Sequence, residues 1–355
     1  MTMMKSKLIF IVFCMLIMCC FSCSKDKKHE SRKISELKIM THDSFSISRS
    51  VLDQFEKAIH AKIVILKSGD AGQALNKAIL SAGNPLADIF YGVDNTFLSR
   101  ALKAGIFVPY APSGLDRISP ELRLDPENRL VPVDFGDVCL NYDVSWFREH
   151  GRKVPVMLED LVKPEYKGLV VVENPATSSP GLAFVLATIS RFGTHGYLDY
   201  WKKLKANDVL VTNGWKQAYW GKFTAASKGD RPIVVSYASS PAAEVFFSKT
   251  KLESAPTGAV TENGSAFRQI EFAGILKGAS DMELAKKAMD FILSGKFQED
   301  IPLQMFVFPV NKEAQLPEVF VKYAVKTKNP AVLSPEEIDA GRDTWIREWT
   351  ETLLN

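Results

Sequence analysis

Cysteine is almost absent from the part of this chain that has the composition of a folded domain. The chain has 355 residues and five cysteines, and four of these lie within the first 23 residues. Cys139 is the fifth, so an internal disulfide framework is excluded beyond that segment. The overall composition, 46% hydrophobic and 24% charged, is that of an ordinary packed protein, long enough for two domains.

The motifs of common catalytic and metal sites are missing as well. The five histidines are scattered, and none forms an H-x-x-x-H or H-E-x-x-H pair, which argues against a zinc site. The G-x-S-x-G elbow, the G-x-x-x-x-G-K-S/T loop and the G-x-G-x-x-G fingerprint are all absent. His42, Asp43 and Ser44 are adjacent, but a hydrolytic triad is assembled from separate parts of a fold. We therefore predict no catalytic residue, no metal site and no cofactor.

A strong charge of either sign is also lacking. The chain has 44 Lys and Arg against 41 Asp and Glu, and removal of the first 22 residues would take away two lysines and no acids, leaving 42 against 41. A protein that binds nucleic acid through its phosphates normally has a clear basic excess. The sequence therefore predicts no nucleic-acid partner.

The N-terminal segment has the pattern of a secretory signal. Lys5 and Lys7 precede an apolar run at residues 8–21, and Ser22 and Cys23 follow it. The run is shorter than the ~20 residues that a membrane span needs. We expect residues 1–22 to be a signal peptide.

Cys23 occupies a special position after that run. A small residue followed by cysteine resembles a bacterial lipoprotein signal, in which Cys23 would become the lipidated first residue of the mature protein. Residues 23–34 would then be a lipid-anchored, flexible linker. The expected location is the periplasm or the cell surface, anchored to the membrane, and soluble secretion into the periplasm is the alternative.

From Leu37 the chain alternates short apolar runs with helical patterns, as in KIVIL followed by AGQALNKAILSAG. This alternation predicts an α/β fold whose sheet is covered by helices. Apolar runs at 130–144 and 268–279 are candidate crossings between two lobes. We predict that residues 35–134 form the first part of lobe 1 and residues 135–267 form lobe 2. Residues 268–355 would form the second part of lobe 1 with the C-terminal helices.

The C-terminal segment predicts a helix that begins after Ser334. Pro335 fits the first turn, and Glu337 is placed for a capping box with Ser334. Trp345 and Trp349 are four residues apart and would share one face. We expect these two indole rings to dock the helix on a lobe.

Four carboxylates follow predicted strands, and in open α/β sheets ligands bind outside the carboxyl ends of the strands. Trp215, Tyr219 and Tyr237 lie near strand ends of the second lobe. Acidic and aromatic groups together suit a cation with an aromatic body. The carboxylates are Asp43, Asp70, Asp94 and Asp134.

The tripeptide Ser-Ser-Pro occurs twice, at 178–180 and at 239–241, each time after a Val-rich run. Serine is a good N-cap and proline is favoured in the first turn, so each tripeptide predicts a helix start at a strand-to-helix turn. Such turns can present hydroxyl and N–H groups to a ligand. Two ordinary capped helices without a ligand are the alternative.

Several pieces of the sequence together resemble the thiamine-binding substrate-binding proteins of bacterial ABC importers. They include HDSF at 42–45, ADIFYGVDN at 87–95, VPVDFGDVCLNYD at 131–143, VTNGWKQAY at 211–219 and VSYASSP at 235–241. Their order extends over residues 37–350. The resemblance implies a type II, two-lobed periplasmic-binding-protein fold, each lobe a mixed, mostly parallel sheet flanked by helices, with the ligand in the cleft between the lobes. It also implies a monomer that delivers its ligand to ABC transporter permease subunits and performs no chemistry.

The resemblance also implies which positions hold the ligand. The matching residues are Asp70, Ala71, Ser178, Ser179, Trp215, Tyr237, Ala238, Ser239, Ser240 and Pro241. His42, Asp43, Asp94, Asp134 and Phe306 complete the predicted set of cleft residues.

Three positions depart from the family pattern. His42 and Ala243 stand where relatives commonly have tyrosine, and Phe306 stands where they have tryptophan. A thinner aromatic cage makes a thiamine phosphate, a pyrimidine or thiazole fragment, or another organic cation a plausible ligand. Each lost aromatic pair is worth about 0.5–1.5 kcal/mol.

Two other functions stay open at this point. Related two-lobed proteins bind ferric iron through paired tyrosines, and Tyr237 could be one, although the chain lacks an adjacent Tyr-Tyr. A thiamine- or pyrimidine-processing enzyme would need Cys139 as a nucleophile. That residue lies in an apolar strand pattern, which favours inert packing.

Overall fold

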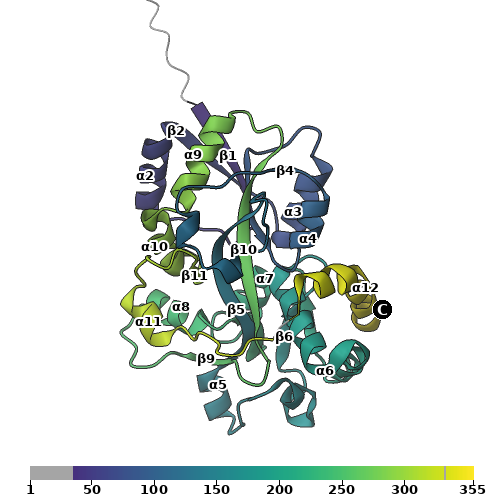
Figure 1. Cartoon of the computed structure of the whole chain (residues 1–355). Coiled ribbons are helices and arrows are strands. Elements are labelled where there is room, and N and C mark those ends of the chain that lie inside the picture. The colour runs from purple at the N-terminus through teal and green to yellow at the C-terminus, as the bar shows by residue number, and fades with distance from the viewer. Residues whose placement is uncertain (1–34, 332) are drawn as a thin grey trace, which may run out of the picture. The chain divides into compact units, whose positions relative to one another are not determined.

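Two long strands form the spine of the protein. The computed structural model describes residues 35–331 and 333–355. In it, β5 (Val131–Asp143) pairs antiparallel with β10 (Phe267–Leu276), and Figure 1 shows this pair running through the middle of the molecule. Both strands lie where the sequence predicted the crossings, at 130–144 and 268–279.

The chain before β5 follows the predicted alternation. Strands β1 and β2 are parallel, β1 and β3 are parallel, and β3 joins β10 in the antiparallel sense. The elements are β1 (Ser35–Thr41), α2 (Arg49–Ile59), β2 (Ala61–Lys67), α3 (Ala71–Leu80), β3 (Ile89–Asp94), α4 (Leu98–Lys103) and β4 (Phe107–Val108), followed by short 3₁₀ turns at Leu115–Arg117 and Pro120–Leu122.

The chain between β5 and β10 builds the second half. Here β6 pairs in parallel with β7 and β8, and β8 and β9 join β5 antiparallel. The elements are α5 (Val144–Glu149), β6 (Val170–Glu173), α6 (Ser179–Ala206), β7 (Leu210–Thr212), α7 (Trp215–Tyr219), β8 (Ile233–Tyr237), α8 (Ser240–Phe247) and β9 (Thr257–Val260), with 3₁₀ turns at Leu158–Val162 and Pro164–Tyr166.

After β10 the chain covers the spine with helices and one short strand. The elements are α9 (Met282–Ile292), α10 (Gly295–Gln304), β11 (Phe308–Pro309), α11 (Glu318–Tyr323) and α12 (Pro335–Leu354). In the part of the chain that the structure describes, the strands of both halves join one sheet with the central order β2-β1-β3-β10-β5-β8-β6-β7. The residues from Ser35 onward form one compact unit, and the predicted boundaries near 134 and 267 fall within the shared strands. The division into lobes at those boundaries stays a prediction.

Helix starts follow the local chemistry of the sequence. Pro180 and Pro241 lie in the first turns of α6 and α8, as the two Ser-Ser-Pro tripeptides predicted, although the N-cap serines make no capping hydrogen bond with their side chains. Ser334 begins α12 through the predicted capping box with Glu337. The two Ser-Ser-Pro helix starts lie a few residues after the ends of β6 and β8.

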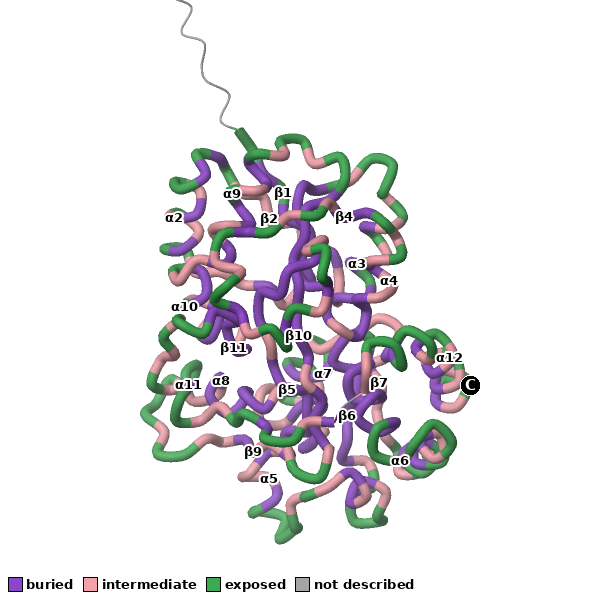
Figure 2. Tube along the Cα trace, viewed as in Figure 1, coloured by how far each residue is buried: buried purple, intermediate pink, exposed green. Residues whose placement is uncertain are grey.

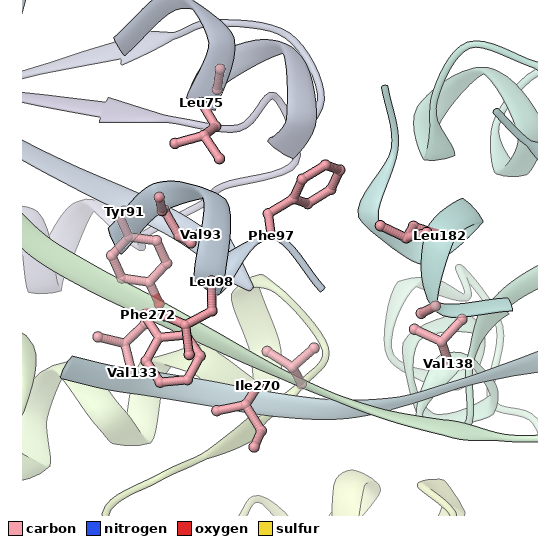
Figure 3. Close-up of a cluster of buried hydrophobic side chains, with 14 of the residues drawn as sticks. Leu75, Tyr91, Val93, Phe97, Leu98, Val133, Val138, Leu182, Ile270 and Phe272 are labelled. Atoms are coloured by element: carbon pink, nitrogen blue, oxygen red, sulfur yellow. The ribbon is translucent and has the colours of Figure 1, made fainter. Parts of the chain in front are cut away.

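The hydrophobic core lies along both faces of the spine. Figure 2 shows the central strands as buried and the outer faces of the helices as exposed. Figure 3 shows Tyr91, Val133 and Phe272 packed together where β3, β5 and β10 meet, and all three are at most 1% exposed. Among residues 35–331 and 333–355, no helix is long and apolar enough to cross a membrane.

Trp349 docks α12 as predicted. It is fully buried, and its ring meets Trp201 of α6 edge to face at a centroid distance of 5.4 Å. We expect Trp349→Ala to lower the free energy of unfolding by about 3–5 kcal/mol, because it removes a large buried side chain and leaves a cavity. Urea unfolding measures this loss. The control is Leu354→Ala on the same helix, where the side chain is 48% exposed. Equal stability of the two variants would contradict the docking role.

Candidate functional site

A cavity of about 230 Å³ opens where the strand ends of the two halves meet. It exceeds the ~150 Å³ apolar cavity that holds a benzene ring, so it has room for a small organic molecule. The loops after β1 and β2, the starts of α6, α7 and α8, β10 and residues 304–307 all contribute to it. Its charged lining residues are His42, Asp70, Lys216 and Glu271, and its aromatic ones are Trp215, Tyr219, Trp220, Tyr237, Phe247 and Phe306.

Asp70 connects the two halves at the edge of this cavity. It is the N-cap of α3, and its Oδ1 accepts a hydrogen bond from the backbone N–H of Ala71 at 2.8 Å. Its Oδ2 accepts one from the N–H of Trp215 at 3.0 Å, at the start of α7 in the other half. Desolvation raises the pKa of Asp70 above its ordinary value, although these two N–H donors oppose the shift. Both carboxylate oxygens are thus engaged by backbone.

Gly214 lets the two halves approach this closely. A Cβ at this position would lie 2.7 Å from Oδ2 of Asp70. Gly72 has the same role on the other side, because a Cβ there would lie 3.1 Å from the carbonyl oxygens of Ala176 and Thr177. A side chain at either glycine would hold the walls of the cavity apart.

Trp215 forms the aromatic wall of the cavity together with its neighbours. Its Nε1–H donates to Oγ of Ser236 at 2.8 Å, which fixes the orientation of the indole. The ring stacks on Tyr219 at 4.9 Å and meets Trp220 edge to face at 6.1 Å. Trp215 is only partly buried. The hydrogen bond and the stacking present one face of a fixed indole to the cavity.

Tyr237 is held in the cavity lining by a buried polar network. Its hydroxyl donates to Oε1 of Gln269 at 2.7 Å. The amide of Gln269 donates in turn to Asp94 Oδ2 and to Ser179 Oγ, each at 2.6 Å. Gly136 of β5 leaves room for the phenol ring, because a Cβ there would lie 2.9 Å from Tyr237 Cδ1. The network couples the cavity wall to the spine.

Three buried carboxyls lie behind the cavity. Burial, followed by the nearby Glu271 carboxylate, raises the pKa of Asp94 to about 7, although Thr96 and Gln269 donate hydrogen bonds to it. Burial and Glu271 also raise the pKa of Asp134 well above its ordinary value, and Tyr91 donates to that carboxyl at 2.6 Å. Glu173 is 1% exposed, and burial raises its pKa strongly. Burial thus favours the neutral form of all three carboxyls.

Comparisons with known proteins match this architecture. The model of the family described as bacterial extracellular solute-binding protein matches residues 84–332. This chain belongs to that family.

Relatives of this chain include thiamine-binding periplasmic proteins. That of Brucella melitensis is 31% identical over 323 residues, covering 88% of this chain and 91% of the relative. That of Escherichia coli is 30% identical over 318 residues, covering 88% and 92%. The structure titled "Periplasmic thiamin binding protein" has a TM-score of 0.80 at 28% identity and covers 90% of this chain and 96% of its own. The predicted resemblance and the type II fold are confirmed.

Iron-binding structures share the fold of this solute-binding protein but less of its sequence. Iron-bound HitA from Pseudomonas aeruginosa has a TM-score of 0.71 at 20% identity, covering 89% of this chain and 99% of its own. That likeness shows the fold alone. Within the described residues, no group of three or more His, Cys, Asp or Glu side chains could hold a metal ion.

The predicted site residues of this solute-binding protein divide into two layers. Eight line the cavity: His42, Asp70, Ala71, Ser179, Trp215, Tyr237, Ser240 and Phe306. Six are buried behind it: Asp94, Asp134, Ser178, Ala238, Ser239 and Pro241. Asp43 accepts the N–H of Gly69 at 3.0 Å and lines a neighbouring small cavity instead. Cys139 is fully buried and does not line the cavity, and burial raises the pKa of its thiol.

Sequence reasoning missed several lining residues of the cavity. Glu271 lies in the apolar run RQIEFAGIL, where it looks like an ordinary strand residue. Lys216 and Phe247 are on short helices, and Trp220 directly follows one. So few residues do not establish which side of a helix faces the cavity. One signal in the sequence could have identified Glu271 as a site residue. It is a charged residue within a predicted buried strand, and a buried charge needs a partner or a function.

Asp94 gives the site a testable dependence on pH. A carboxyl whose pKa is raised in the folded state stabilises the fold below its unfolded pKa, near 4, and loses that contribution as pH rises toward about 7. Asp94→Asn cannot ionise, so we expect a smaller loss of unfolding free energy between pH 5 and pH 8 than in the parent. Urea unfolding at both pH values measures it. Asp199→Asn, whose side chain is 70% exposed, should follow the parent. A parent-like pH profile in Asp94→Asn would contradict the assignment.

Proposed function

We propose that this solute-binding protein captures thiamine, a thiamine phosphate or a closely related organic cation, and delivers it to an ABC import permease. The observation that carries the proposal is one cavity whose lining combines acidic side chains with a fixed aromatic wall. The 31% identity to a thiamine-binding periplasmic protein supports the same ligand class.

The charge of the cavity suits a ligand with a fixed positive ring. Thiamine carries a thiazolium cation, which is attracted to aromatic faces by about 0.5–2 kcal/mol per contact. Trp215 and Tyr237 offer such faces, and Asp70 and Glu271 add negative potential. A neutral sugar would gain nothing from these carboxylates beyond hydrogen bonds.

The hydroxyls at the start of two helices suit the polar end of such a ligand. Ser179 at the start of α6 and Ser240 at the start of α8 both line the cavity. Helix starts offer unpaired N–H groups to hydroxyl or phosphate oxygens. Ser178, Ala238, Ser239 and Pro241 support these turns from behind, and Ser239 Oγ donates to the carbonyl of Phe306.

Aromatic residues near the cavity mouth compensate for the departures from the family pattern. Ala243 lines the cavity, and Phe247, one helical turn further along α8, lines it as well. The ring of Phe247 lies 5.2 Å from that of Phe306. We propose that this pair covers the ligand in place of the aromatic residue missing at Ala243.

Chemistry at the site is not part of the proposed function. The thiol of Cys139 is buried away from the cavity, and an enzyme using it would need a reactive thiolate at the ligand. Ferric iron would need several hard oxygen donors at one point, whereas the hydroxyl of Tyr237 is occupied by Gln269.

Membrane anchoring through Cys23 is the second part of the proposal. Cys23 lies outside the described residues, and the support is its place after the apolar run. Full-length protein expressed in a bacterium that processes lipoproteins should partition into detergent, and Cys23→Ser protein should not. Cys139→Ser is the matched control and should partition like the parent. Equal partitioning of the Cys23→Ser protein would contradict the anchor.

Trp215 should report thiamine binding directly. We expect thiamine to quench the fluorescence of the parent protein, because the ligand stacks against the indole. Trp215→Phe should remove most of that change, and the unfolding midpoint without ligand should stay close to the parent, because Trp215 is only partly buried. Trp146→Phe, at a tryptophan that does not line the cavity, should keep the quenching. Full quenching in Trp215→Phe would contradict this placement.

A further inference from the structure

Glu271 lines the cavity next to an irregularity in the spine. The register of β10 against β5 shifts between Glu271 and Phe272, and its register against β3 shifts between Phe272 and Ala273. β-Bulges of this kind redirect side chains and are over-represented next to binding sites. The Glu271 side chain lines the cavity although the residue is only 8% exposed.

Glu271 differs from the other carboxylate that lines the cavity. Both oxygens of Asp70 accept backbone N–H groups, from Ala71 and Trp215. Backbone N–H groups do not lose their hydrogen when the pH changes. Both oxygens of Asp70 therefore take part in hydrogen bonds, one of which joins the two halves. Glu271 instead faces His42, with 3.3 Å between Oε2 and Nε2. Its ion-pair partner is therefore a group that can lose its charge, and the carboxyl of Asp134 is a second hydrogen-bonding neighbour.

The backbone of β3 leaves room for the imidazole ring of His42 beside Glu271. Its ring packs on Gly92 of β3, where any Cβ would overlap with Cδ2 of the imidazole. Gly92 also has φ of +105°, a conformation that favours glycine. His42 is 7% exposed and lines the cavity. The pair is thus built into the cavity wall.

We propose that Glu271 is the carboxylate that holds the positive ring of the ligand, and that protonated His42 competes with the ligand for it. This inference rests on the proposed function, because it assumes a cationic ligand. It makes Glu271 a binding residue and His42 a residue that sets how affinity depends on pH.

The direction of that dependence follows from the charges around the pair. Burial lowers the pKa of His42, but the attraction and hydrogen bond of Glu271 outweigh it and raise the pKa above 6.5. Below that pKa the pair is neutral, and above it Glu271 is free to hold a cation. Affinity for a cation therefore rises with pH, and binding releases protons. The other groups that act on His42 or Glu271 are Asp70, Lys67, Asp94, Asp134, Tyr91 and Tyr237.

Asp94 titrates in the same range, so a variant is needed to separate it from His42. His42→Gln keeps an amide that can donate to Glu271 but cannot titrate. If His42 sets the pH dependence, this variant loses most of it while Asp94 is unchanged. If Asp94 sets it, the variant keeps the parent profile.

Calorimetric titration with thiamine from pH 5.5 to pH 8.5 tests the inference. The parent should bind at least tenfold more tightly at pH 8.5 and release protons when buffers of different ionisation enthalpy are compared. Glu271→Gln should bind at least tenfold more weakly than the parent at pH 8.5, with a flat profile. His42→Gln should vary less than threefold over the range. Glu262→Gln, the same change at an exposed side chain off the cavity, should match the parent.

The outcomes separate this inference from the proposed function. Parent-like affinity in Glu271→Gln, or no proton release by the parent, overturns the inference and leaves thiamine capture standing. If the affinity of His42→Gln depends on pH as in the parent, the proposed competition between protonated His42 and the ligand is overturned. Absence of thiamine binding by the parent at every pH overturns both the proposed function and the inference. Unfolding midpoints without ligand establish that each variant is folded.

Discussion

The antiparallel pairing of β5 with β10 is the constraint on which the site depends. Side chains alternate along each strand, so Glu271 lines the cavity and Gln269 on the same face accepts from the hydroxyl of Tyr237. Arg268 and Ile270 line a second cavity on the other side of the spine. Arg268 makes two hydrogen bonds to the carboxylate of Asp137 across the pair, at 2.8 and 2.9 Å. The pairing therefore sets which groups the ligand meets and which groups stabilise the spine.

The approach of the two halves completes the site. The hydrogen bond from Trp215 N–H to Asp70 brings the aromatic wall of one half against the acidic edge of the other. Burial in this arrangement raises the pKa of Asp94 and of Asp134, which favours their neutral forms. In the proposed function, selectivity for a cation would come from the single carboxylate of Glu271 in the cavity lining, rather than from the number of acidic residues nearby.

The fold was largely predictable because its signals are local. The apolar runs at 130–144 and 268–279, the Ser-Ser-Pro helix starts and the Ser334 capping box each act over a few residues. The site was predictable where strand ends turn into helices, as at Asp70 and Trp215. Asp94 ends β3 but points behind the cavity, because the side a residue faces depends on the register of its strand. The expectation that Asp134 follows a strand was wrong, because β5 begins at Val131 and continues through Asp134 to Asp143. The place of Glu271 depended on which face of β10 meets the cavity, and that is known only once the strand pairing is known.

A crystal structure of the protein grown with thiamine tests the central claim most directly. The account predicts electron density for the ligand between Trp215 and Tyr237, with the thiazolium ring nearer to Glu271 than to any other carboxylate. Ligand density in the second cavity beside Arg268 and Lys326, with the first cavity empty, would contradict it.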